Sequence, residues 1–249
     1  MSKDKEIKKI QKKCWSQYKS LIGLDENYTF LYGNPVKVHV PLDTAVGGIM
    51  IIGAYPTAHF NTINGQTDVP VSDHLYPFSN ECYFDGSRIR MVESGRELTD
   101  EYLDKLGINR DQCWITDLVK VFLFKEGHIK KYETLGYKGH SATRNRFSDF
   151  AKKSRSLLLE EIQLADPKII LTLGSEVAAA VFQVSEKAAT SMMNETPVPL
   201  QISESVYQCW ALPHPGIIMR NSEKAGKWKN ILAGQIVAIK NYLNDNTRF

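Results

Sequence analysis

Residues 48–57 read Gly-Ile-Met-Ile-Ile-Gly-Ala-Tyr-Pro-Thr, and this stretch decides the expected fold. Its short apolar run, bounded by Gly48 and Gly53, predicts a strand that is buried on both faces. Such strands are typical of the centre of a parallel sheet. The glycine and proline that follow end the strand in a turn.

Three more strands of this kind are expected, with helical periodicity between them. The strands are expected near residues 113–117, 168–173 and 206–212. Apolar spacings of three or four residues predict helices at about 3–22, 95–106, 147–165 and 224–243. This alternation predicts an α/β fold: one domain over residues 1–249, whose central, mostly parallel four-stranded sheet carries helices on both faces.

Two long polar segments interrupt the pattern, at residues 58–92 and 123–145. Both are expected as loops. Loops of this length in a folded domain are usually functional or mobile.

The composition excludes several classes of protein. With 43% hydrophobic and 24% charged residues among 249, the chain is neither disordered throughout nor fibrous. It has no apolar run of about 18 residues that would predict a membrane span, and its charged N-terminus does not resemble a secretory signal. We therefore expect a cytoplasmic protein. The net charge of +3 permits a polyanionic partner without requiring one.

The familiar cofactor and nucleophile motifs are missing from the sequence. No dinucleotide fingerprint, P-loop, nucleophile elbow or H-E-x-x-H motif is present. The four cysteines lie far apart, which argues against a zinc ribbon and against a disulfide framework. The histidines show no metal-ligand spacing, so no metal is expected.

Distinctive residues follow three of the expected strands: Gly53–Thr57, Asp117 and His214–Gly216. In open parallel sheets, ligands bind outside the carboxyl ends of the strands. We therefore expect these three segments to form one site.

Four segments together resemble the uracil-DNA glycosylase superfamily. They are Gly53-Ala-Tyr-Pro-Thr57, Trp114-Ile-Thr-Asp-Leu-Val-Lys120, Pro167-Lys-Ile-Ile-Leu-Thr-Leu-Gly174 and Leu212-Pro-His-Pro-Gly216. Their order and separation are similar to those of the group that normally carries an iron–sulfur cluster. The resemblance covers about residues 48–243. It implies an enzyme that flips a modified base out of DNA and cleaves its N-glycosidic bond, in base-excision repair.

The sequence departs from the family pattern at several positions. The cysteines that would hold the cluster are absent, so we expect no cofactor. Tyr55 stands where some families have an activating Asp or Asn, Asp117 replaces the usual Asn, and Gly216 replaces the usual Ser.

The resemblance implies that His214 donates a hydrogen bond to the leaving base. A hydrogen-bond donor aimed at the departing base would stabilise its developing negative charge, as an oxyanion hole does. The plainer alternative is a hydrogen-bonded structural histidine. Tyr55 is a poor base because the pKa of a tyrosine is about 10, so it would orient water, wall the pocket or simply pack under the loop. The backbone of Gly53, Ala54, Pro56 and Thr57 is expected to bind the base or a phosphate.

Asp117 has three alternative roles. A carboxylate only accepts hydrogen bonds, whereas the usual Asn also donates. Asp117 is therefore either the base that activates water or a reader of a donor-rich base edge, such as the N1–H of guanine, hypoxanthine or xanthine. The third alternative is a cap on a nearby turn.

The remaining site predictions concern stacking and DNA contact. Phe78 is the expected stacking aromatic, with Tyr83 and Phe84 as rivals and a simple loop anchor as the alternative. An apolar wedge and a phosphate contact are expected after His214. Their residues are Ile217, Ile218, Met219 and Arg220; the alternative is an ordinary helix entry.

Three functions stay open. The first is a DNA glycosylase-like hydrolase, and the second is an inactive member of the superfamily that binds DNA or a nucleobase. The third is an enzyme that acts on free nucleosides or nucleotides. The expected partner is DNA that carries a damaged or deaminated base; no membrane partner is expected, and the expected state is a monomer.

Overall fold

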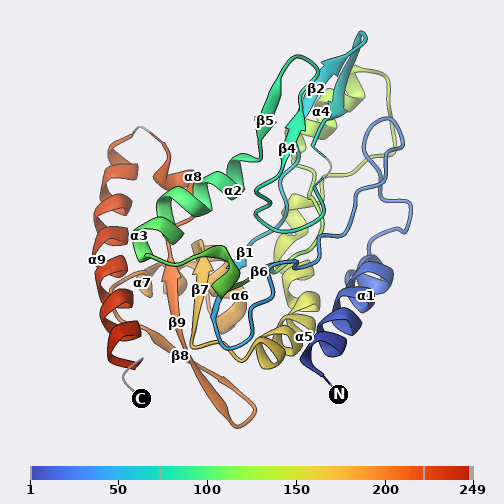
Figure 1. Cartoon of the computed structure of the whole chain (residues 1–249). Helices are drawn as coiled ribbons and strands as arrows, with labels where there is room; N and C mark the ends of the chain where they lie inside the picture. Colours follow the sequence, from blue (N-terminus) through green and yellow to red (C-terminus); the bar gives the residue numbers. More distant parts are fainter. Residues whose placement is uncertain (1, 73, 221, 247–249) are drawn as a thin grey trace.

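The computed structural model describes residues 2–72, 74–220 and 222–246. Its centre is a five-stranded sheet in the order β6-β1-β7-β9-β8 (Figure 1). The strands are β1 (Ile49–Gly53), β6 (Cys113–Asp117), β7 (Ile169–Leu173), β8 (Val198–Ile202) and β9 (Ser205–Leu212). The first four in the order run parallel, as the sequence predicts, while β8 pairs antiparallel with β9 at the edge.

The strand count is the one small correction to the predicted sheet. Four strands are expected and five are found, because Val198–Ile202 joins as an edge strand. Its outward residues Pro199 and Gln201 are exposed, so it lacks the unbroken apolar run that marks the central strands. An edge strand needs only one buried face, and its sequence signal is correspondingly weak.

The helices complete the α/β architecture. They are α1 (Lys3–Ile22), α2 (Glu93–Leu98), α3 (Asp104–Leu106), α4 (Glu126–Thr134), α5 (Phe147–Ala165), α6 (Ser175–Phe182), α7 (Glu186–Ser191), α8 (Pro215–Ile218) and α9 (Glu223–Asn246). A π-helical turn at Thr99–Leu103 joins α2 to α3, so the helix expected at 95–106 has an irregular centre. No helix among the described residues is long and apolar enough to cross a membrane.

Alternate residues of each strand pack on opposite sides of the sheet, which gives two core layers. Met50 and Ile52 face the layer that contains α1, α5 and α6. Ile49 and Ile51 face the layer that contains α3 and α9. Helices therefore cover both faces of the sheet, which leaves the ends of the strands as the places where a ligand could reach it.

The two segments expected as loops contain regular structure. Residues 58–92 include the hairpin of β2 (Phe60–Ile63) with β3 (Gln66–Pro70), and that of β4 (Cys82–Phe84) with β5 (Ile89–Met91). Residues 123–145 include α4. These strands have three to five residues with almost no fully buried side chain, so they lack the apolar alternation that predicts a strand.

Candidate active site

The carboxyl ends of the parallel strands lie beside one another and carry the predicted site. Gly53 of β1 pairs directly with Asp117 of β6. The ladder continues past both strands, because Leu118 N–H donates to Gly53 O at 2.9 Å and Val119 N–H donates to Ala54 O at 2.9 Å. The turn after β1 is thereby held against the end of β6.

A small cavity of about 120 Å³ opens at this edge of the sheet. It is smaller than the roughly 300–1,000 Å³ of pockets that take drug-sized ligands, so it suits one small ring. The predicted residues that line it are Ala54, Tyr55, Pro56, Thr57, Phe78, Asp117 and His214. Four segments that are far apart in sequence thus share one cavity.

Gly53 allows Phe78 and Asp117 to approach each other. A Cβ at position 53 would overlap both Oδ1 of Asp117 and the ring of Phe78. The aromatic ring and the carboxyl group therefore lie against the same glycine. The rivals are placed elsewhere: Tyr83 stacks on His59, and Phe84 is 61% exposed on the β4–β5 hairpin.

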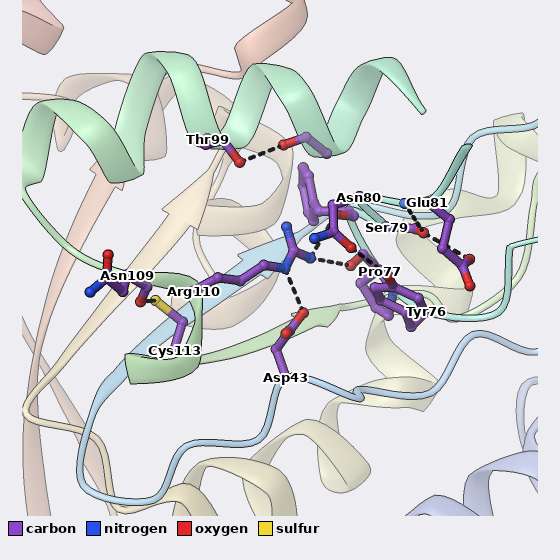
Figure 2. Close-up of polar contacts among 12 residues, drawn as sticks. Asp43, Tyr76, Pro77, Ser79, Asn80, Glu81, Thr99, Asn109, Arg110 and Cys113 are labelled. Atoms are coloured by element: carbon purple, nitrogen blue, oxygen red, sulfur yellow. Dashed lines mark hydrogen bonds and ion pairs between the residues drawn. The ribbon is translucent and has the colours of Figure 1, made fainter. Parts of the chain in front are cut away.

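Arg110 holds the loop that carries Phe78. Its Nη2 donates to Phe78 O at 2.6 Å, and its Nε forms an ion pair with Asp43 at 2.8 Å (Figure 2). Phe78 has a φ of +50°, a left-handed conformation that costs a non-glycine residue of order 1 kcal/mol or more. Gly95 of α2 lets this loop pass close by, since a Cβ there would overlap Ser79 O.

His214 lies between β9 and α8 with its tautomer set by the backbone. Its Nδ1 accepts a hydrogen bond from Gly216 N–H at 3.0 Å. Burial lowers the pKa of His214, and the nearby charges of Arg220 and Lys125 lower it further. The imidazole is therefore neutral near pH 7, and its one proton is on Nε2. Gly216 supplies this contact through its backbone, so the replacement of the family's Ser does not remove it.

Asp117 is a buried carboxyl group with an altered acidity. Burial raises its pKa to about 7; Lys120 opposes the rise and Glu161 adds to it. Among the described residues, no side chain or backbone group hydrogen-bonds to its carboxyl oxygens. Lys120 is instead occupied by Glu161 at 2.7 Å and by Thr116 Oγ1 at 2.6 Å. Asp117 is thus protonated in part of the molecules at neutral pH and is left open to a ligand.

Tyr55 is held in place by a neighbouring arginine. Its hydroxyl accepts a hydrogen bond from Arg144 Nε at 3.0 Å, and the Arg144 guanidinium lies 5.2 Å from the centre of its ring. Burial raises the pKa of Tyr55, so the phenol stays protonated. Arg144 also forms an ion pair with Glu176. Tyr55 is a fixed wall of the cavity, and its acidity does not suit a general base.

The residues expected to contact DNA separate into two groups. Ile218 is fully buried against the α9 side of the core, which fits the alternative of an ordinary helix entry. Its packing partners come from other elements, which the local sequence does not reveal. Ile217 and Arg220 line a groove of about 440 Å³ that shares Tyr55 and His214 with the cavity. Met219 is 40% exposed beside them.

Several cavity residues are absent from the predicted set. They are His39, His59, His74, Glu93, Ser94 and Glu97. The rings of His39 and His74 lie 4.9 Å apart, edge to face. Burial lowers the pKa of His39 to about 3, and its Nδ1 has no hydrogen-bond partner among the described residues. These residues come from loops and a short helix, where no periodicity marks them.

The cysteines stay apart in the fold. Cys14, Cys113 and Cys209 are buried, and Cys82 is exposed. Within the described ranges, no three or more His, Cys, Asp or Glu side chains are grouped to hold a metal ion. The expected lack of an iron–sulfur cluster stays a prediction.

These features define a class: an α/β protein with a small cavity at the ends of its parallel strands, lined by a carboxyl group and an aromatic ring. A family model, the uracil DNA glycosylase superfamily, matches residues 44–233. The chain belongs to this superfamily, as the sequence motifs indicate. No curated protein matches the chain.

Proposed function

We propose that this protein flips a modified base out of DNA and hydrolyses its N-glycosidic bond. One observation carries the proposal: the Phe78 ring, the Asp117 carboxyl group and a neutral His214 meet in one small cavity. Membership of the superfamily supports a DNA glycosylase-like function in general. A flipped base must be held by stacking and by contacts to its polar edge, and these are the groups that the cavity offers.

The proposed reaction breaks the bond between C1′ of the sugar and the base nitrogen. The base leaves with the electron pair while the sugar becomes cationic, and water then adds to C1′ and loses a proton. His214, with its proton on Nε2, donates a hydrogen bond to the departing base. A neutral imidazole suits this role because it adds no positive charge beside the cationic sugar.

The state of Asp117 decides which base the cavity accepts. A protonated carboxyl group offers one O–H donor and one C=O acceptor, the same pair as the Asn usual in the family. In this form it matches a lactam edge, such as N3–H and O4 of uracil. In its ionised form it only accepts, so it then suits a donor-rich edge or acts as the base that activates water.

The two roles of Asp117 have opposite pH dependence. Because its pKa is about 7, the protonated fraction falls as pH rises through neutrality. If Asp117 reads a lactam edge, kcat/KM on uracil falls over this range, and Asp117→Asn removes the fall and keeps activity. If it is the general base, activity rises with pH, and Asp117→Asn slows hydrolysis by about 10²–10⁴.

The test is a cleavage assay on oligonucleotides that carry uracil, hypoxanthine, xanthine or oxidised bases, read after alkali treatment. Each base is assayed from pH 5.5 to 8.5 at about half-unit steps with the unsubstituted protein and Asp117→Asn. Release of any of these bases supports the proposal. If none of these bases is released, the proposal is contradicted.

Tyr55 favours a second candidate, a superfamily member that binds DNA without cleaving it. In this protein a protonated phenol stands where some relatives have an activating carboxylate, and Arg144 holds it there. Tight binding to the modified oligonucleotides without base release would favour this function. A salt-independent affinity for free nucleosides would instead favour a small-molecule enzyme.

A further inference from the structure

The β4–β5 hairpin has one apolar face that is open to solvent. Pairing places Cys82 opposite Met91 and Phe84 opposite Ile89, so these four side chains share one face, which we call the hairpin face. The exposed fractions are 61% for Phe84, 74% for Ile89 and 48% for Met91. Such a continuous exposed apolar set on a two-stranded hairpin indicates a contact surface.

The opposite face and the turn hold the hairpin rigid. Tyr83 stacks on His59, with ring centres 5.2 Å apart and an angle of 20° between the planes. Asp85 Oδ1 accepts hydrogen bonds from the backbone N–H groups of Ser87 and Arg88 at 2.8 and 2.9 Å. Asp85 Oδ2 pairs with Arg90 at 2.5 Å. A pre-ordered surface loses little entropy when a ligand binds.

The hairpin borders the candidate base cavity. Phe78 lines the cavity just before the hairpin begins, and Glu93 lines it just after the hairpin ends. His59, which stacks under Tyr83, lines the same cavity. A strand that delivers a nucleotide to this cavity must therefore pass near the hairpin.

The small size of the hairpin face and the charged Arg88 at the adjacent turn favour nucleobases over a protein surface. A stable protein interface takes about 20–30 residues on each side, far more than these four. One or two unstacked bases need only an aromatic and a few apolar side chains. Arg88 is exposed at the turn and has no ion pair among the described residues, so it is available to a phosphate.

We propose that the hairpin face stacks against bases of the DNA strand that flank the flipped nucleotide, with Arg88 at a neighbouring phosphate. The proposal rests on the proposed function, because it needs a strand at the cavity. It adds a contact surface that is separate from the segment after His214.

Affinity for DNA tests the stacking directly. The probe is a labelled oligonucleotide with one abasic-site analogue, measured by fluorescence anisotropy at several salt concentrations. Phe84→Ser should weaken binding by roughly 5- to 100-fold, the usual effect of losing one stacked base. Ile89→Ser should weaken it less. Arg88→Ala should reduce the slope of log affinity against log salt by about 1.

The matched control is Val206→Ser. Val206 is 54% exposed in the β8–β9 hairpin, at the other end of the molecule from β4 and β5 (Figure 1). It should leave DNA affinity unchanged. Circular dichroism and melting temperature should show that all four variants are folded, since none of these side chains is buried.

Cys82 provides a direct readout of position. It lies on the hairpin face and is exposed, whereas Cys14, Cys113 and Cys209 are buried. Oligonucleotides with a disulfide-activated tether on one base should cross-link to Cys82 when that base neighbours the abasic site. A tether several nucleotides away should not react, and Cys82→Ser should abolish the cross-link.

The outcomes separate this proposal from the proposed function. If the unsubstituted protein binds and cleaves DNA but Phe84→Ser behaves like Val206→Ser, the hairpin face does not contact DNA and this proposal is overturned. A cross-link that forms equally at every tether position would also overturn it. If the unsubstituted protein neither binds nor cleaves any modified DNA, both proposals fail.

Discussion

The floor of the cavity and its outer wall are built in different ways. The floor comes from the ends of β1, β6 and β9, where strands buried on both faces place Asp117 and His214. The outer wall comes from the segment around Phe78, whose conformation depends on Arg110 and Asp43 from other parts of the chain. A sheet sets the position of its strand ends through the whole core, whereas the wall depends on a few polar contacts.

This difference predicts unequal responses to substitution. Changes in the floor should remove chemistry while the fold persists. Changes in the wall should alter how the base is held, and their effects should depend on one another. Substitutions in the two regions test that contrast, and the strongest effect is expected at His214.

His214→Ala should have the largest effect on activity. In the proposed reaction it removes the hydrogen bond to the leaving base, and losing one such donor typically costs about 10²–10³ in kcat. Binding of an abasic-site oligonucleotide should change little, because the departing base is absent from that ligand. Single-turnover cleavage and anisotropy measure the two quantities. A histidine that is only structural would lower the melting temperature and leave the rate of the folded protein intact.

Gly53→Ala should disturb the floor and the wall of the cavity at the same time. The added methyl group overlaps Asp117 Oδ1 and the Phe78 ring, and overpacking of this kind typically costs 1–3 kcal/mol of stability. Activity should fall more than 10-fold, on the scale of 1.4 kcal/mol for each factor of ten, because both base contacts are displaced. Urea unfolding and cleavage assays give the two effects.

Gly127→Ala is the matched control for Gly53→Ala. Gly127 lies in α4 with no atom near the place of its missing Cβ. Alanine favours a helix over glycine by up to about 1 kcal/mol, so this variant should be neutral or slightly more stable. If both variants behaved alike, the close approach at Gly53 would have no functional meaning.

Arg110→Gln should weaken the wall and leave the floor intact. The variant loses the hydrogen bond to Phe78 O and the ion pair with Asp43, and contacts of a charged group contribute about 1.5–3 kcal/mol. Because Arg110 acts through Phe78, KM should rise more than kcat falls. In a Phe78→Ala background, Arg110→Gln should have little further effect on KM. Additive effects in this double-mutant cycle would show that Arg110 does not position Phe78.

Tyr55→Phe should have the smallest effect. The variant loses only the hydrogen bond from Arg144 to the hydroxyl group, and the ring still lines the cavity. Stability should therefore fall by about 0.5–1.5 kcal/mol. Cleavage should stay within a few-fold of the unsubstituted rate across the pH range. A large loss of kcat with normal stability would show that the hydroxyl group takes part in positioning water.

Periodicity and strand ends account for what could be predicted. The apolar runs locate β1, β6, β7 and β9 to within about a residue, because burial on both faces leaves no place for polar side chains. The same rule places Asp117 and His214 at one edge of the sheet. The prediction of Ile218 as a wedge stays untested, but its side chain is fully buried, as the alternative of an ordinary helix entry would place it. The short strands β2 to β5 were missed because almost none of their side chains is fully buried.

The amino-acid sequence is enough to predict the α/β class, the parallel sheet and the segments that meet at the cavity, because these follow from local hydrophobic patterns and from motifs of adjacent residues. Only the tertiary structure decided the chemical state of those segments. The pKa of Asp117 depends on burial and on Lys120 and Glu161 around it. The position of Phe78 at the cavity depends on Arg110, which contacts both Phe78 and Asp43 from a distant part of the chain. Such properties arise from long-range packing and electrostatics, which no local pattern records.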